Sequence, residues 1–218
     1  MDNNKNKLKE NSLFISSLCV FIISMAIGII FYNRLPDKMA VHFNSDFVAD
    51  NYAPKWFALF GITLLLLFIH CITIFIMNKD PKQAGHSKAI KLIIYMLMPI
   101  LSIVVEIELI SFSLNKSFNI STCTFLLIGI VIMLLGNYLP KTRQNYTIGF
   151  KLPWTLSSEE NWNKTHKLAG ELWVPGGVLI SLLSMLIKNS LPSIIVILLI
   201  ISIIPTFYSY YLYSKSNK

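Results

Sequence analysis

The chain has 218 residues, of which 54% are hydrophobic and only 14% are charged, and its mean hydropathy is +0.60. This composition lies far outside the range of soluble domains and excludes a separate globular unit of ordinary size. The net charge of +8 would by itself suit a nucleic-acid partner, but its distribution along the chain indicates membrane topology, so we expect no direct nucleic-acid binding.

A helix that crosses a bilayer needs about 20 mainly apolar residues. Six stretches meet this requirement: Leu13–Tyr32, Trp56–Met77, Ala89–Phe112, Ser121–Leu139, Leu168–Ile187 and Leu191–Tyr213. The first is longer than the apolar core of a signal peptide, about 7–15 residues, and no small-x-small cleavage site follows it. The sequence therefore predicts an all-α integral membrane protein, a single membrane domain over residues 1–218 with a bundle of six transmembrane helices.

The Lys and Arg residues are divided unevenly between the two sides of this predicted bundle. With a cytoplasmic N-terminus, 14 of the 19 basic residues lie on the cytoplasmic side, namely Lys5, Lys7, Lys9, Lys79, Lys82, Lys88, Lys91, Lys141, Arg143, Lys151, Lys164, Lys167, Lys215 and Lys218. The other five are Arg34, Lys38, Lys55, Lys116 and Lys188. This division follows the positive-inside rule and predicts that both termini are cytoplasmic.

The extracellular loop at residues 33–55 follows the first predicted helix. Val41-His42-Phe43 alternates as a short strand does, and Asn44, Ser45 and Asp46 then favour a turn. His42, Asp46 and Asp50 are residue types that bind metals or protons, but in one loop they more often form hydrogen bonds that fasten it. We expect no metal site and no cofactor.

The three cysteines fall inside predicted helices without a partner at metal-ligand spacing, so we expect them to be small packing residues. Four titratable residues also lie within the predicted helices: Glu106, Glu108, Glu171 and His70. Intramembrane carboxylates are costly and are therefore functional candidates. We expect Glu106 and Glu108 at the headgroup level, pointing in different directions because they are two residues apart. For His70 we expect a partner on a neighbouring helix.

The cytoplasmic loop at residues 140–167 is the most informative part of the chain. Pro140 ends the fourth helix, and Leu152-Pro153 predicts an extended approach to Trp154. Ser157 and Glu160 have the spacing of a capping box, which predicts the start of a new helix. We therefore expect an ordered loop whose last part, residues 158–167, is helical and continuous with the fifth transmembrane helix.

Trp162, His166, Gly170 and Trp173 then follow at spacings that place them on one face of that helix. Gly170 leaves room for a close neighbour on this face, and Pro175-Gly176-Gly177 predicts a weak or kinked point further along. Two interpretations remain open. The loop is an aromatic anchor, with Trp154 and Trp162 at the lipid headgroups, or it is a recognition surface on which Asn161, Thr165 and His166 are polar contacts.

The loop resembles a known family in four motifs: Gly136-Asn-Tyr-Leu-Pro-Lys, Asn145-Tyr-Thr-Ile-Gly, Pro153-Trp-Thr-Leu-Ser and Trp162-Asn-Lys-Thr-His-Lys-Leu-Ala-Gly170. They resemble the SdpI family of bacterial membrane proteins, with an SdpI-like region at residues 121–213. The segment Leu35-Pro-Asp-Lys to Asp50 resembles the DUF1648-like region that often precedes it, here a helix pair at residues 13–77. Ala40 and Ser45 stand where that region usually has proline and glycine.

The resemblance implies a non-enzymatic immunity or sensor protein of the bacterial cytoplasmic membrane. Its implied partners are the lipid bilayer, a secreted peptide toxin and a small DNA-binding repressor held at the membrane. On the motifs, the site residues it implies are Asn145, Gly149, Pro153, Trp154, Thr155, Asn161, Trp162, Thr165, His166 and Gly170, with His42, Asn44 and Asp50 in the extracellular loop. The alternative is a small transporter or lipid-handling protein that uses the intramembrane carboxylates.

Overall fold

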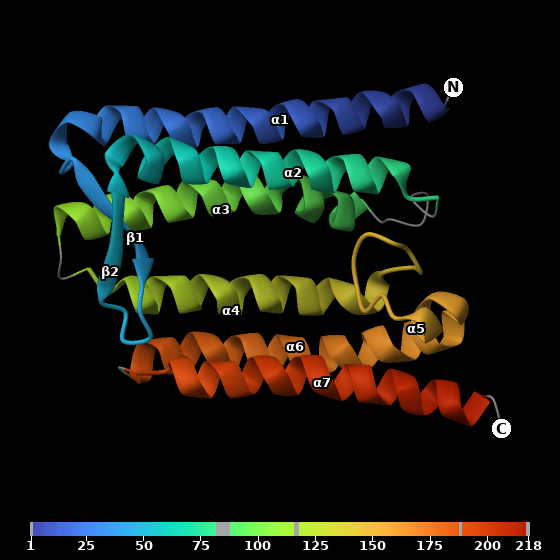
Figure 1. The fold of residues 1–218 in the computed structure, drawn as a ribbon. Helices are drawn as coiled ribbons and strands as arrows, with labels where there is room; N and C mark the ends of the chain where they lie inside the picture. Colours follow the sequence, from blue (N-terminus) through green and yellow to red (C-terminus); the bar gives the residue numbers. More distant parts are fainter. Residues whose placement is uncertain (1, 82–87, 116–117, 188, 217–218) are drawn as a thin grey trace. The chain divides into compact units, whose positions relative to one another are not determined.

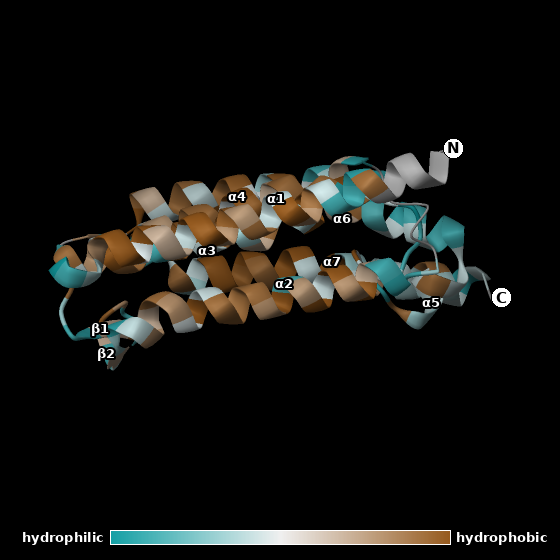
Figure 2. Cartoon of the chain, turned by 90° about the horizontal axis from the view of Figure 1, so that it is seen from above, coloured by the Kyte–Doolittle hydropathy of each residue, from teal (hydrophilic) through white to brown (hydrophobic). Residues whose placement is uncertain are grey.

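The computed structural model describes residues 2–81, 88–115, 118–187 and 189–216 (Figure 1). Six helices in these ranges are long and apolar enough to cross a membrane, which confirms the predicted all-α membrane fold. Figure 2 shows hydrophobic residues along the middles of the helices and hydrophilic residues toward their ends. The chain divides into two compact units: unit 1 comprises Met1–Phe75 and Lys91–Ile120, and unit 2 comprises Ile76–Ile90 and Ser121–Lys218.

Three long helices supply most of unit 1. Helix α1 (Asp2–Phe31) ends in the 3₁₀ turn η1 (Tyr32–Arg34), a π-helical turn η2 (Phe57–Gly61) leads into α2 (Ile62–Lys79), and α3 spans Lys88–Leu114. Helix α1 begins well before the predicted Leu13. Its first turns are rich in Lys, Glu and Asn, and because Lys and Glu favour helices as well as water, hydropathy alone does not locate this start.

A β-hairpin lies between α1 and α2. Strand β1 (Lys38–Phe43) pairs antiparallel with β2 (Ala49–Pro54), with irregular register between Ala40 and Phe43. The predicted strand at Val41–Phe43 is confirmed, whereas β2 was not predicted because its mostly polar sequence does not alternate. Apolar side chains of the hairpin pack on the helices of unit 1 in a buried cluster: Leu35, Met39, Ala58, Leu59, Leu109 and Ile110.

Unit 2 contains the remaining helices and the 140–167 loop. Helix α4 (Ile120–Tyr138) ends in the 3₁₀ turn η4 (Leu139–Lys141), the short α5 (Pro153–Ser157) precedes α6 (Glu159–Leu186), and α7 spans Leu191–Ser216. The predicted helix from residue 158 into the fifth span is confirmed as α6. The five-residue helix α5 was not predicted, because the extended Leu152 before Pro153 gives no sign that a helical turn follows.

The N-terminus of α6 corrects the predicted capping box. Ser158, not Ser157, is the N-cap, and its hydroxyl accepts a hydrogen bond from the Asn161 amide at 3.2 Å. Ser157 instead donates to the Trp154 carbonyl at 3.2 Å, within α5. Glu160 pairs with Lys164. Ser157 does not form the predicted capping box because it is the last residue of α5.

Glycines allow α4 and α6 to approach closely. A Cβ atom on Gly129 would lie 2.6 Å from the Gly177 carbonyl oxygen, and one on Gly170 would lie 2.8 Å from the Gly136 carbonyl oxygen. The close neighbour predicted for Gly170 is thus α4, together with the Pro140 ring. Helix α6 is uninterrupted through Pro175-Gly176-Gly177, and Gly176 and Gly177 lie close to Ile201 and to Gly129; the predicted weak or kinked point stays a prediction.

The cysteines differ from expectation. Cys19 and Cys71 are exposed, and Cys123 is partly covered. Cys19 on α1 and Cys71 on α2 therefore lie on the outer helix surface, which a membrane would cover with lipid, and not in the packed interior.

Candidate functional site

The 140–167 loop is built around a turn held by Asn145. The Asn145 side-chain oxygen accepts hydrogen bonds from the Thr147 and Ile148 amides, both at 2.8 Å, and its NH₂ group donates to the Arg143 carbonyl at 2.8 Å. Asn145 is only 1% exposed. Its side chain satisfies three backbone groups that have no helix or strand partner, and so fixes the path of the loop.

Asp80, just beyond the end of α2, holds the same turn. Its Oδ2 atom accepts from the Tyr146 amide at 2.9 Å and from the Thr147 hydroxyl at 2.8 Å. Both partners and Asp80 belong to unit 2. Asp80 was not predicted as a site residue, because its local sequence shows no more than an acid directly after a long apolar helix.

His166 on α6 ties the next part of the loop to the helix. The Phe150 amide donates to His166 Nε2 at 2.9 Å, and Nδ1 lies 2.8 Å from the Trp162 carbonyl oxygen. A carbonyl oxygen can only accept, so Nδ1 carries the proton and Nε2 is the acceptor. The two hydrogen bonds therefore fix a neutral imidazole with one defined tautomer.

Gly149 makes this contact possible. Its φ of +119° lies in a region that side chains with a Cβ atom rarely adopt. A Cβ atom there would lie 2.1 Å from His166 Nε2 and 3.1 Å from the Trp162 ring. We call Gly149, Trp162 and His166 the loop latch, because they hold the loop against α6.

Trp162 is the buried centre of the loop latch. Its side chain is fully buried, its ring stacks on His166 with centroids 3.9 Å apart, and its Nε1 donates to the Thr142 carbonyl at 2.8 Å. A headgroup anchor would lie at the lipid surface, so the anchor interpretation does not describe Trp162. Trp154 is only partly buried; it donates to the Ser209 hydroxyl at 2.8 Å and packs on Tyr210 and Tyr213 of α7.

Polar side chains close the rest of the loop. Pro153 opens α5, and the Thr155 hydroxyl donates to the Phe150 carbonyl at 2.5 Å. The Asn161 amide donates to the Ser209 carbonyl at 2.8 Å, while its oxygen accepts from the Thr165 hydroxyl at 3.0 Å. The structure thus brings all ten predicted loop residues into unit 2, and the polar groups of Asn161, Thr165 and His166 point inward to partners in the protein.

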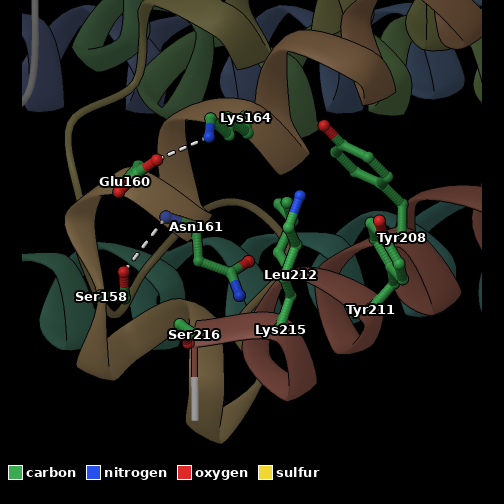
Figure 3. A pocket seen from close by; sticks show the side chains of 9 residues that line it. All are labelled: Ser158, Glu160, Asn161, Lys164, Tyr208, Tyr211, Leu212, Lys215 and Ser216. Atoms are coloured by element: carbon green, nitrogen blue, oxygen red, sulfur yellow. Dashed lines mark hydrogen bonds and ion pairs between the residues drawn. The ribbon is translucent and has the colours of Figure 1, made fainter. Parts of the chain in front are cut away.

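A groove opens beside this site, between the start of α6 and the end of α7 (Figure 3). Its volume is about 440 Å³. Glu160 and Lys164 of α6 form part of its wall, with Lys164 Nζ 2.5 Å from Glu160 Oε1. The rings of Tyr208 and Tyr211 line it from α7. The groove is lined by Ser158, Glu160, Asn161, Lys164, Tyr208, Tyr211, Leu212, Lys215 and Ser216.

The predicted extracellular residues lie together in the hairpin of unit 1. His42 Nδ1 lies 2.6 Å from Asp50 Oδ1, joining the two strands, and the Asn44 side chain accepts from the Asp46 and Val48 amides at 3.0 and 2.9 Å. These contacts fasten the turn, as expected for this loop. Within the described residues, no group of three His, Cys, Asp or Glu side chains is placed to hold a metal ion.

The titratable residues of the predicted helices fall into two groups. Glu106, Glu108 and His70 are buried inside unit 1, with Glu106 and His70 at 1% and 0% exposure. Helix α3 continues for two turns beyond Glu106 to Leu114, so this carboxyl lies within the helix span and not at its end. Glu171 is exposed on α6 in unit 2.

Comparison with known proteins identifies both regions. Residues 141–209 match the SdpI/YfhL protein family, and residues 19–67 match a domain of unknown function, DUF1648. The resemblance to the SdpI family is confirmed. Immunity protein SdpI of Bacillus subtilis (strain 168) is 27% identical over 211 residues, covering 96% of this chain and 99% of the relative. No solved structure matches the chain.

The SdpI match coincides with the loop and the helices that hold it. The matched range of residues 141–209 includes four residues of the site: Thr142, Trp162, His166 and Ser209. Asp80 lies outside this range. With its six long apolar helices, the chain is a multi-pass bacterial membrane protein.

Proposed function

We propose that this chain is a membrane immunity protein that protects a bacterium against a secreted, membrane-active peptide toxin. The observation that carries the proposal is the match along nearly the whole of both chains to a protein named for immunity. A match confined to hydrophobic helices would support a membrane location alone. Here it also includes the polar 140–167 loop, where hydropathy cannot produce similarity by itself.

We assign the loop latch a positioning role in this function. Its polar atoms are already bonded within the protein, so a partner would contact the surface that the loop latch holds in place. The adjacent groove offers Lys164, Lys215, Tyr208 and Tyr211 to such a partner. We propose that this groove, on the predicted cytoplasmic side, receives a small DNA-binding repressor and holds it at the membrane when toxin is present.

The immunity proposal is tested by survival of a toxin-sensitive bacterium that expresses this chain. The unaltered chain should protect, and Trp162→Ala or His166→Ala should reduce protection because each opens the loop latch. Trp56→Ala is the matched control, since Trp56 is 57% exposed and its recorded ring contact is with its neighbour Phe57.

Membrane abundance must be measured beside survival for every variant. Lost protection at normal abundance supports the site, whereas a parallel fall of both shows that the residues serve stability alone. Full protection by the Trp162→Ala/His166→Ala double variant at normal abundance would contradict the site assignment. The repressor is tested by imaging a fluorescent fusion of a small repressor encoded beside this chain, which should reach the membrane only when toxin and this chain are both present.

The same assay addresses the transporter alternative. Glu106 and His70 lie in the interior of unit 1, as a transport path would require, whereas Glu171 is exposed in unit 2. Neutralising Glu106, Glu108, Glu171 and His70 together should leave immunity mostly intact if it depends on binding. Complete loss of protection at normal abundance would favour transport.

A further inference from the structure

Buried polar side chains line the interior of unit 1 at regular intervals. They recur seven or four residues apart on each helix, so each set lies on one helix face. All of them are at most 1% exposed. The set comprises Ser17 and Ser24 on α1, Thr63 and His70 on α2, and Tyr95, Ser102 and Glu106 on α3, and we call it the polar track.

His70 marks one level of the polar track. The Ser17 hydroxyl donates to the Phe14 carbonyl at 2.7 Å and lies 2.9 Å from His70 Nε2. The hydroxyl proton is therefore engaged, and Nε2–H is the donor between the two. His70 Nδ1 is buried, and no residue that the structure describes forms a hydrogen bond with it. Tyr95 packs edge-on against the imidazole, and one turn beyond it Lys91 pairs with Glu10 of α1.

Glu106 lies at the other end of the polar track. The Thr63 hydroxyl donates to Glu106 Oε2 at 3.4 Å, while Oε1 is buried and has no hydrogen-bond partner among the described residues. A Cβ atom on Gly28 would lie 2.3 Å from Oε1, so this glycine brings the carboxyl against the bare backbone of α1. One turn earlier on α1, the Ser24 hydroxyl is also buried without a hydrogen-bond partner in the described ranges.

In the part of the chain that the structure describes, Glu106 has no recorded ion pair. Thr63 of α2 bonds it and Gly28 of α1 lies against it, the Phe60 ring lies beside Gly28, and none of the three titrates. Beyond Phe60, Tyr32 stacks on that ring, and the Lys55 ammonium lies 4.7 Å from the centroid of the Tyr32 ring. An ionised carboxylate here would be an unpaired charge within a membrane-spanning helix, which is strongly unfavourable. A carboxylic acid carries no such penalty.

We propose that Glu106 is a proton-binding site that exchanges its proton with water along the polar track. Lys91 and Glu106 are separated by fifteen residues of α3, which corresponds to about 22 Å along the helix. Together with the Glu10–Lys91 pair at its end, the polar track therefore covers most of a bilayer core of about 30 Å. The titratable groups along it are His70, Tyr95 and the Glu10–Lys91 pair. This assignment is independent of the immunity proposal.

The test is labelling with dicyclohexylcarbodiimide, an apolar reagent that reacts with protonated carboxyl groups. The acid proton moves to a carbodiimide nitrogen, the carboxyl oxygen bonds to the central carbon, and the adduct rearranges to a stable N-acylurea without a leaving group. The full chain in phosphatidylcholine–phosphatidylglycerol vesicles should gain one adduct that peptide mass spectrometry places on Glu106. Labelling should be at least about tenfold faster at pH 6 than at pH 9, because exchange with water empties the site.

Glu106→Gln should abolish the adduct, and Glu171→Gln, which alters an exposed carboxyl in unit 2, should leave it unchanged. The site is mapped on the unaltered chain, so the result does not depend on whether a variant folds. An absence of label on Glu106 would overturn the proposal. Labelling that is equally fast at pH 6 and pH 9 would also overturn it, because it would show a carboxyl that is permanently protonated and closed to water.

Discussion

Asn145, Thr155 and His166 show how single side chains replace secondary structure in the 140–167 loop. Each bonds backbone groups that no helix or strand satisfies: Arg143, Thr147 and Ile148 for Asn145, and Phe150 for the other two. Such bonds depend on one residue each and not on a cooperative ladder. The loop is therefore most sensitive at the residues that make or permit these bonds.

Gly149 gives the sharpest test at this scale. Gly149→Ala places a Cβ atom at positive φ and against His166 Nε2, so the backbone strain and the lost Phe150 bond should together cost about 2–4 kcal/mol. We expect a clearly lower midpoint of thermal unfolding in detergent. The matched control is Gly61→Ala, because the three atoms nearest to its Cβ would belong to the exposed Phe57 side chain. Equal midpoints for the two variants would contradict the role of Gly149.

At the scale of elements, the sequence predicted what hydropathy and helix periodicity encode. The six long helices and the shared face of Trp162, His166 and Gly170 follow from composition and spacing. The partners on that face did not follow, because Thr142 and Phe150 contribute backbone atoms that any residue possesses. Ser157 and Ser158 are equivalent caps by residue type, and only the three-dimensional path of α5 decides between them.

Asp80 links two elements that are distant in sequence, the end of α2 and the 145–148 turn. Asp80→Ala removes two hydrogen bonds to a carboxylate, worth about 2 kcal/mol or more together, so the loop should open roughly tenfold or more often. Trypsin should then cleave after Arg143 or Lys151 correspondingly faster in the detergent-solubilised protein. The cleavage rate of Asp80→Asn should lie between those of the unaltered chain and Asp80→Ala, because an amide oxygen can still accept a hydrogen bond.

The control for this experiment is Asp46→Ala, because Asp46 is exposed and its recorded contact is made by its backbone amide. Cleavage at Arg143 and Lys151 should be unchanged in that variant. If Asp80→Ala is cleaved no faster than Asp46→Ala, the turn is held without Asp80.

At the scale of the whole molecule, the division of basic residues predicts that both termini and the 140–167 loop are cytoplasmic. Four of the 19 basic residues in this division lie outside the described residues: Lys82, Lys116, Lys188 and Lys218. Reporter fusions after residue 45 should report an external position, and fusions after residues 150 and 218 an internal one. An external reading at residue 150 would invert the model of topology and move the groove of Figure 3 to the other side of the membrane.

The glycine contacts between α4 and α6 also bear on how unit 2 assembles. Gly129 opposes Gly177 and Gly136 opposes Gly170, and on each helix the two glycines are seven residues apart. A slip of one helix by two turns would still match one glycine with another, but it would bring the remaining two against larger side chains. Only the native register places both glycines of α4 opposite glycines of α6. During insertion, the two-turn slip is therefore the natural kinetic trap, and closure of the loop over α6 would disfavour it because the connection between the helices has one length.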